Sequence, residues 1–185
     1  MHLRLRVRPY DLSLLGERGE EIIKGELAHR SLYFLDPLPA DKYYKFLKSH
    51  VTQAVERALS LAHTHDPRLH RRETLRHKLI DLLTRALALK EVRPFFIQEV
   101  SYEAELEVLD EKGHLHRLDR LVYTSQGPVL LEFKLGTRRR AHWEQVRSYS
   151  TLLTKVLGKR PKTYLFYLEE PSLIEVTRPC QVPLF

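Results

Sequence analysis

Two acidic residues and a lysine stand close together in a stretch whose pattern predicts a β-hairpin. The segment 116–134 places Asp119 on a first apolar strand and Glu132 and Lys134 on a second, with a Ser-Gln-Gly-Pro turn between them. Side chains at positions i and i+2 of a strand share a face, so Glu132 and Lys134 should project together while their apolar neighbours pack on the opposite face. The pattern therefore predicts a group of charges within a half-buried sheet.

This group of charges has two interpretations. An unpaired charge in half-buried surroundings is costly, and a divalent cation would remove that cost. Two carboxylates supply the hard oxygen ligands that suit Mg²⁺ or Mn²⁺, and a lysine two residues along can reach a phosphate or a water on that metal. A buried Asp–Lys–Glu ion-pair cluster with no catalytic role is the other interpretation.

Composition limits the class of protein. The chain has 185 residues, enough for one domain with a sizeable core, and its formal net charge is +7. That balance favours an acidic partner such as nucleic acid. Cys180 is the only cysteine, which excludes an internal disulfide framework, a cysteine-rich zinc site and an iron–sulfur cluster held by four cysteines.

The sequence shows no membrane or export signal. Its first residues alternate arginine with leucine or valine, and no run of about 18 apolar residues follows. We therefore expect a soluble, cytoplasmic protein that does not enter a membrane. The alternating start predicts a strand with one cationic face, which is either an arm that touches phosphates or an edge strand protected by charge.

The first half of the chain has helical patterns. Apolar residues at helical spacing predict helices over about 17–35, 41–62 and 72–89. In the first of them, Gly25 precedes His29 by one turn on the same face, which leaves room for backbone or a ligand beside the imidazole. Both a metal ligand and a structural histidine are open interpretations of this position.

Pro94 marks a change from helices to a sheet. Residues 96–108 alternate apolar side chains with an acidic row, which predicts a long amphipathic strand. The acidic row should face solvent or a basic neighbour, and an approach of Glu99 to the metal is the alternative. A turn over 110–113 then leads the chain back toward Asp119.

A helix over 141–157 and one or two strands after it complete the predicted elements. Gln145 and Tyr149 are i, i+4 neighbours on one face of that helix. The order of helices, three-strand meander, helix and final strands predicts one α+β (α/β-like) domain with a mixed central sheet. Residues 1–93 should be mainly helical, and 94–185 should hold the sheet core.

Four short motifs, in this order, resemble the signature of the PD-(D/E)xK nuclease superfamily, specifically its RecB-like branch. They are Gly25–His29 on a helix, Asp119–Leu121 on a strand, Glu132–Lys134 on the next strand and Gln145–Tyr149 on the following helix. The segment 129–167 also resembles the nuclease domain at the C-terminus of UvrD/Rep-type helicases, the AddA and RecB arrangement. Glu132 stands where aspartate is commoner in the family.

The resemblance implies a fold and a chemistry. The sheet would be of the restriction-endonuclease-like type, flanked by helices. His29, Asp119, Glu132 and the backbone carbonyl of Phe133 would bind one or two Mg²⁺ or Mn²⁺ ions, and no iron–sulfur cluster is expected. Lys134 would orient or polarise the attacking water and offset charge in the transition state.

Further residues are implied to touch DNA or to support the lysine. Gln145 and Tyr149 would contact DNA or hold Lys134, and a core tyrosine with a bonded hydroxyl is the alternative for Tyr149. The arginines implied to bind DNA are Arg120, Arg138, Arg139, Arg140 and Arg147. The run of three precedes a helix N-terminus, where backbone phosphates bind well, and a solvated loop is its alternative interpretation.

The expected function is that of a metal-dependent deoxyribonuclease. It would be an exonuclease or single-strand nuclease that works with a covalently linked or separate helicase in DNA recombination or repair, on single strands or ends. An RNA endonuclease of the cap-snatching type uses a similar His, Asp, Glu and Lys set and is an alternative. A non-catalytic nucleic-acid-binding module is the contrasting class, and the intact Asp119, Glu132 and Lys134 argue against it.

Overall fold

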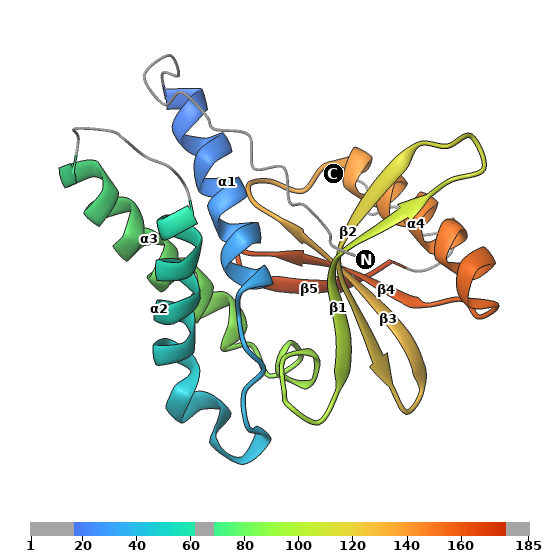
Figure 1. Cartoon of the computed structure of the whole chain (residues 1–185), viewed down its shortest axis with the longest axis horizontal. Coiled ribbons are helices and arrows are strands. Elements are labelled where there is room, and N and C mark those ends of the chain that lie inside the picture. Colours follow the sequence, from blue (N-terminus) through green and yellow to red (C-terminus); the bar gives the residue numbers. More distant parts are fainter. Residues whose placement is uncertain (1–16, 62–68, 177–185) are drawn as a thin grey trace.

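The structure of the protein is a computed structural model that describes residues 17–61 and 69–176 (Figure 1). The predicted cationic strand at the start of the chain and Cys180 lie outside these residues. The helices are α1 (Glu17–Tyr33), α2 (Tyr43–Leu61), α3 (Leu69–Leu87) and α4 (Arg140–Leu157), with short 3₁₀ turns η2 (Ala40–Lys42) and η3 (Arg93–Phe95). The strands are β1 (Ser101–Leu109), β2 (Leu115–Thr124), β3 (Gly127–Lys134), β4 (Lys162–Tyr167) and β5 (Ser172–Glu175).

The five strands form one mixed sheet in the order β1-β2-β3-β4-β5. β1, β2 and β3 make an antiparallel meander, β4 runs parallel to β3, and β5 is antiparallel to β4. Parallel neighbours need a crossover connection, and α4 supplies it. Glu132 pairs with Leu165 and Lys134 with Tyr167, so the end of β3 that carries the acid and the lysine lies beside the end of β4.

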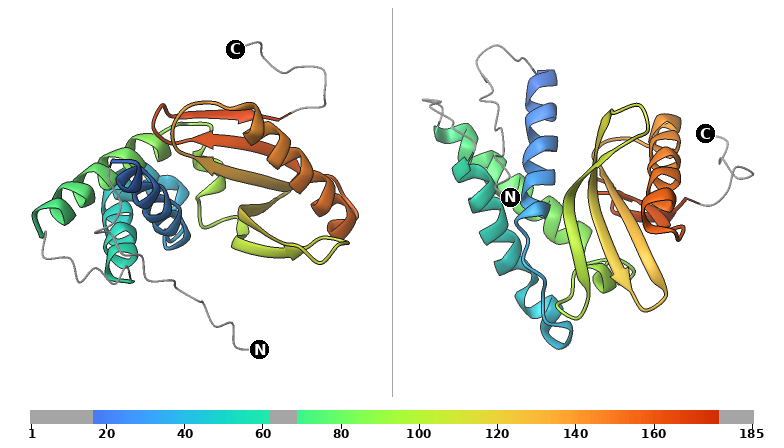
Figure 2. Two further views of the ribbon diagram at one scale, coloured as in Figure 1. Left: turned by 90° about the horizontal axis from the view of Figure 1, so that it is seen from above. Right: turned by 45° about the vertical axis from the view of Figure 1, so that its right-hand side comes forward.

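Helices α1, α2 and α3 cover one face of the sheet (Figures 1 and 2). Their buried side chains recur at helical spacing and include Leu27, Leu32, Leu47, Val51, Ala54, Ala58, Leu79, Leu82 and Ala86. They pack with Val129, Leu131 and Phe133 of β3 in one core, where full burial of each large apolar side chain contributes about 1.5–3 kcal/mol. Ile22, predicted in the same stripe, is 56% exposed, so the packed part of α1 begins near Ile23.

Helix α4 covers the opposite face of the sheet. Trp143 and Val146 pack against Leu165 and Tyr167 of β4, and Leu153 packs against the β2–β3 pair. The helix ends at Gly158, whose φ of 66° is left-handed and costs glycine no steric strain. Helix α4 therefore packs against the strands that carry the predicted site and holds them together.

Strand β1 is strained at Glu105. Its φ is 54°, which among the described residues is the one positive φ outside glycine. A residue with a side chain adopts this conformation at a cost of about 1–3 kcal/mol, and such strain is concentrated at functional sites. The partner strand β2 is also irregular here. In a regular strand, Leu118 and Leu121 would point to opposite faces, because they are three residues apart, yet both belong to one buried cluster. The β1–β2 hairpin therefore twists at Glu105.

The prediction of an α+β fold with a mixed sheet flanked by helices and a helical N-terminal part is confirmed. The predicted turn at 110–113 lies between β1 and β2. The turn predicted at 125–128 is shorter in the structure, because β3 already begins at Gly127. Within 17–61 and 69–176, no helix has the length and apolar character needed to cross a membrane.

Candidate metal centre

Helix α1 brings a histidine against strand β2. His29 Nδ1 lies 3.0 Å from Asp119 Oδ1, and the edge of the imidazole meets the ring of Phe133 with 5.9 Å between centroids. A Cβ added at Gly25, one turn earlier, would meet no atom within 4 Å, so the space beside this glycine is open. The aromatic contact and the carboxylate together fix the orientation of the His29 ring.

Glu105 completes a group of three possible ligands. One side-chain ligand atom each from His29, Glu105 and Asp119 lies within 4.8 Å of the others. We call these residues the metal cluster. Imidazole nitrogen together with carboxylate oxygen suits Mn²⁺, and the carboxylates suit Mg²⁺. Arg117 Nε lies 2.9 Å from Glu105 Oε2, yet burial still raises the pKa of Glu105 against the effect of that arginine.

The sequence prediction missed Glu105. It placed this residue in an acidic row that faces solvent or a basic neighbour, and it gave Glu99 as the acid that might approach a metal. That alternative is wrong, because Glu99 is exposed and precedes β1. Glu105 lies between two paired positions, Ala104 with Arg120 and Leu106 with Leu118, and so faces Asp119 across the hairpin. Counting residues back along both strands from the 110–113 turn gives the same pairing. The sequence therefore contained the information needed to place Glu105 opposite Asp119.

Asp119 is held by neighbours on two elements. Its Oδ2 accepts a 2.7 Å hydrogen bond from the Phe133 backbone N–H, while Oδ1 faces His29. Burial disfavours the charged carboxylate, but His29, Lys134 and the Phe133 N–H together hold the pKa of Asp119 below its ordinary value. These contacts therefore favour the ionised form of Asp119 and fix its orientation.

Glu132 and Lys134 lie on the neighbouring strand. Glu132 Oε1 accepts a hydrogen bond of 3.1 Å from the Asp119 backbone N–H, and Lys134 Nζ donates to Oε2 over 3.4 Å. The Glu132 side chain is 2% exposed and that of Lys134 is 14% exposed. Burial, followed by the charge of Asp119, raises the pKa of Glu132 well above its ordinary value, although Lys134 opposes this. Glu132 lies outside the metal cluster, so its role as a ligand stays a prediction, as does that of the Phe133 carbonyl.

The residues around the metal cluster fit a divalent cation. Asp119 has a second carboxylate on each side: that of Glu105, in the metal cluster, and that of Glu132, which Lys134 contacts. Burial raises the pKa of both Glu105 and Glu132, and the charge of Asp119 adds to the effect in each. A cation would favour the ionised form of both.

Residues of α4 border this site. Gln145 is exposed, and its Nε2 donates a 3.0 Å hydrogen bond to the Tyr149 hydroxyl. Tyr149 is buried where α4 packs against β2, and the centre of its ring lies 5.7 Å from that of His116. Burial raises the pKa of the Tyr149 phenol, and the charges of Glu132 and Asp119 raise it further. Tyr149 thus has the surroundings of a core tyrosine with a bonded hydroxyl. It also lies close enough to Glu132 and Asp119 for their charges to act on its pKa.

The arginines at 138–140, the last of which begins α4, are all exposed, as a role in phosphate binding requires. Arg138 Nη2 donates to Ser172 Oγ over 3.3 Å, and its guanidinium lies 5.8 Å from the centre of the Tyr167 ring. Arg140 pairs with Glu144 at 2.9 Å. Arg139 immediately precedes α4. Their contact with DNA stays a prediction.

The prediction that Arg120 contacts DNA is wrong. Its side chain is 1% exposed and lies between the rings of Phe96 and Tyr102, 4.4 and 3.6 Å from their centres. Its Nε donates to the Phe95 carbonyl, and burial lowers the pKa of Arg120 to about 10. The reason is the strand period, because the residue after Asp119 points to the opposite face of β2, where Phe96 and Tyr102 enclose it.

Arg147 is half-buried in α4. Its Nε and Nη2 are shielded from solvent and have no hydrogen-bond partner among the described residues. A guanidinium in this position is less available to a strand of DNA than those of the exposed run before the helix. Its predicted contact with DNA has no support from this geometry.

Comparisons with known proteins add little. No protein-family model matches the sequence, and no curated protein matches it. Among solved structures, the chain is similar to one described as the crystal structure of SSO0001, with 14% sequence identity and a TM-score of 0.34. The match covers 86% of this chain and 80% of that chain. A similarity of this size indicates neither the fold nor the function of the chain.

Proposed function

We propose that the protein is a metal-dependent nuclease of the PD-(D/E)xK type that hydrolyses phosphodiester bonds in DNA. The observation that carries this proposal is the meeting of His29, Glu105 and Asp119, with ligand atoms within 4.8 Å, beside a lysine on the adjacent strand. These residues come from α1, β1, β2 and β3, which are far apart in the chain. A purely structural ion-pair cluster has no need for an imidazole and two carboxylates, from three elements, whose ligand atoms lie this close together.

The chain's own residues have distinct roles in this proposal. His29, Glu105 and Asp119 would hold Mg²⁺ or Mn²⁺, which supplies Lewis acidity and lowers the pKa of a bound water. The Phe133 N–H and the Asp119 N–H fix the carboxylates of Asp119 and Glu132, so the ligands need little reorganisation. Pre-oriented ligands favour tight binding and rapid chemistry.

Lys134 would act on the phosphate. Glu132 Oε2 accepts from its ammonium group at 3.4 Å and so keeps that group at the edge of the metal cluster. An ammonium here stabilises the negative charge that develops on the phosphorus oxygens and orients a water for attack. Glu132 is therefore a positioning residue for the lysine in the described geometry.

The finer parts of the proposal concern the substrate. The net charge of +7 and the exposed Arg138, Arg139 and Arg140 favour a polyanion. Single strands or ends, and a helicase that exposes them in recombination or repair, are proposed from the resemblance of the four motifs to RecB-like nuclease domains.

The experiment is a cleavage assay with labelled single- and double-stranded DNA and RNA in Mn²⁺, Mg²⁺ or EDTA. We expect cleavage of DNA with either metal and none in EDTA. Asp119→Asn should be inactive, whereas Asp81→Asn, a change to an exposed acid that pairs with Arg85 in α3, should keep full activity. Cleavage that survives EDTA would reject the metal mechanism, and cleavage of RNA alone would move the proposal to an RNA endonuclease.

A further inference from the structure

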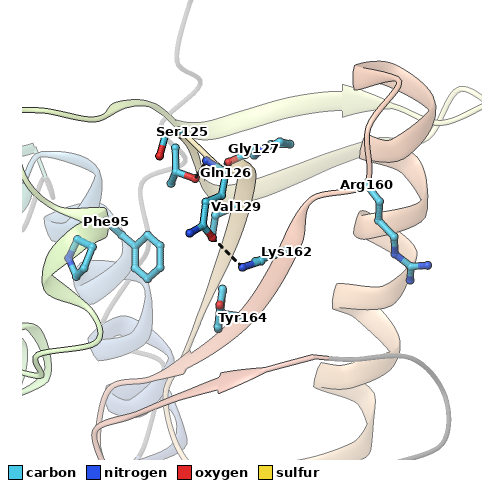
Figure 3. Close-up of a pocket in the computed structure, with 11 residues that line it drawn as sticks. Phe95, Ser125, Gln126, Gly127, Val129, Arg160, Lys162 and Tyr164 are labelled. Atoms are coloured by element: carbon cyan, nitrogen blue, oxygen red, sulfur yellow. Dashed lines mark hydrogen bonds between the residues drawn. The ribbon is translucent and has the colours of Figure 1, made fainter.

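A hollow of about 370 Å³ lies at the end of the sheet away from the metal cluster (Figure 3). Its lining residues are Pro94, Phe95, Thr124, Ser125, Gln126, Gly127, Pro128, Val129, Arg160, Lys162 and Tyr164. They come from η3, the β2–β3 turn and the start of β4. This volume is at the lower end of the range for small-molecule sites, which suits one nucleotide-sized group.

One wall of the hollow is aromatic. The rings of Phe95 and Tyr164 are both half-buried and lie 5.8 Å apart between centroids, tilted by 43°. Val129 of β3 pairs with Lys162, two residues before Tyr164, and forms an apolar floor. A half-buried aromatic ring in a hollow offers a face on which a planar base can stack.

Cations gather where β4 meets the β2–β3 turn. Lys162 lines the hollow two residues before Tyr164, and Lys159 lies beside the lining. Lys162 Nζ donates to Gln126 Oε1 and Lys159 Nζ donates to the Gln126 carbonyl, each over 3.1 Å (Figure 3 shows the first). Gly127 makes the second contact possible, because its φ is 127° and a Cβ there would lie 2.7 Å from Lys159 Nζ. Gln126 therefore accepts from two ammonium groups, one at its side-chain amide and one at its backbone carbonyl.

These cations are not neutralised by acids. In the portion of the chain that the structure describes, no carboxylate forms an ion pair with Lys159, Arg160 or Lys162. Gln126 accepts hydrogen bonds from two of them but carries no charge. Figure 3 shows Gln126, Lys162, Phe95 and Tyr164 around the hollow, with Arg160 at its far rim. A phosphate would supply the missing counter-charge.

We propose that this hollow binds a nucleoside 5′-phosphate unit, with the base against Phe95 and Tyr164 and the phosphate on Lys162, with the charge of Lys159 close by. The Gln126 side chain and the Ser125 hydroxyl, both exposed, are available to the edge of the base. The unit belongs to a single strand, because a base in a duplex is already stacked and cannot enter. The hollow opens on the sheet face that carries the helical layer. It lies at the start of β3, whereas Lys134 is at the end of this strand, so the two are separated by the length of β3, roughly 20 Å.

The test is binding in EDTA, where the proposed nuclease cannot act. Amide resonances would be followed by NMR during titration with thymidine 5′-monophosphate, inorganic phosphate or a short oligothymidylate. We expect the two nucleotides to shift resonances of 124–127, Lys162 and Tyr164, with the oligomer at least about tenfold tighter than the mononucleotide. Equal shifts and affinity with inorganic phosphate, or no shift in 124–127, would overturn the proposal.

Variants test the aromatic and the cationic residues of the hollow separately. Tyr164→Leu should weaken oligothymidylate binding by about fivefold or more, and Tyr164→Phe should restore it, because the ring and not the hydroxyl stacks on the base. Lys162→Glu should weaken binding by about tenfold, whereas Lys48→Glu, the same charge change on exposed α2, should have little effect. Equal losses for the two lysine variants would overturn the proposal.

The result is independent of the proposed nuclease activity. Binding in the hollow with no cleavage in Mn²⁺ would reject the nuclease and keep the pocket. Cleavage by wild type, with no nucleotide-induced shift at 124–127, would do the reverse.

Discussion

The aspartates of two Asp–His groups lie on the β1–β2 hairpin, and the two groups differ in their electrostatics. In the metal cluster, Asp119 contacts His29 and faces Glu105 within a half-buried site. In the tip group, Asp110 Oδ2 lies 3.2 Å from His114 Nδ1 and 3.1 Å from His116 Nε2. Both contain a carboxylate and imidazole, so residue types alone do not separate them.

The number of donors for each carboxylate separates the two groups. Asp110 Oδ1 accepts two backbone hydrogen bonds, from Lys112 and His114, both of 2.9 Å, in addition to the histidine contacts of Oδ2. The contacts with His116 and His114 hold the pKa of Asp110 far below its usual range. This acid is satisfied by its own turn and needs no cation.

The acids in and beside the metal cluster differ from Asp110. Asp119 lies between the carboxylates of Glu105 and Glu132, and burial raises the pKa of both, although Arg117 and Lys134 oppose this. Excess negative charge in a half-buried site is what a bound cation would stabilise, whereas a lone, fully hydrogen-bonded aspartate has no such requirement. The comparison therefore teaches that the balance of acids and donors distinguishes a candidate metal site from a structural pair.

The largest expected effect comes from Lys134→Ala. Loss of the ammonium should lower the cleavage rate by roughly 10²–10⁴-fold and leave DNA binding within about twofold, because the lysine acts mainly on the transition state. Single-turnover kinetics with Mn²⁺ and fluorescence anisotropy measure the two quantities. Lys112→Ala, beside Asp110 at the hairpin tip, is the control and should cleave normally. Near-native turnover of Lys134→Ala would remove the lysine from the proposed chemistry.

The next effect concerns metal affinity. His29→Ala and Glu105→Gln should each weaken Mn²⁺ binding by about tenfold or more, since each removes one ligand. Isothermal titration calorimetry measures this directly. His114→Ala, in the tip group, and His77→Ala, an exposed histidine 2.9 Å from Glu73, should bind Mn²⁺ like wild type. If His114→Ala were the weaker binder, the two groups would have been assigned in the wrong order.

A smaller effect is the pH dependence of stability without metal. The folded-state pKa of Glu132 is raised above its ordinary value of 4.5, so the stability it contributes is complete below that pH and is lost as the pH rises toward the folded value. In EDTA, the Tm of wild type should therefore fall relative to that of Glu132→Gln as the pH increases above about 4.5.

Addition of Mn²⁺ should reduce this loss, with a gain of about 2.7 kcal/mol at a metal concentration of 100 Kd. Thermal unfolding followed by circular dichroism checks both effects. A parallel pH dependence of wild type and Glu132→Gln in EDTA would show that Glu132 titrates normally.

The smallest expected effect belongs to Asp110→Asn. The folded-state pKa of Asp110 is lowered, so its contribution to stability is present above the ordinary value of 3.8 and is lost as the pH falls. The variant should have a slightly lower Tm at neutral pH, and this difference should shrink on acidification. Its Mn²⁺ affinity should be unchanged, and a loss of affinity would contradict the separation of the two groups.

The sequence by itself determined the elements that carry most of the site. Helical spacing put His29 on α1, strand period put Glu132 and Lys134 on one face of β3, and the i, i+4 relation placed Gln145 beside Tyr149. These relations are local, because backbone geometry within one element fixes which side chains share a face. The α+β order followed from the same periodicities.

Tertiary structure alone decided which of several similar residues meet. Glu105, and not Glu99, reaches Asp119, because strand pairing and the left-handed φ of Glu105 set which acid of the row turns toward α1. Arg120 is not available for the predicted DNA contact, because it points to the face opposite Asp119, where Phe96 and Tyr102 cover it. A sequence pattern gives the two faces of a strand, but only packing decides which face is buried and by what.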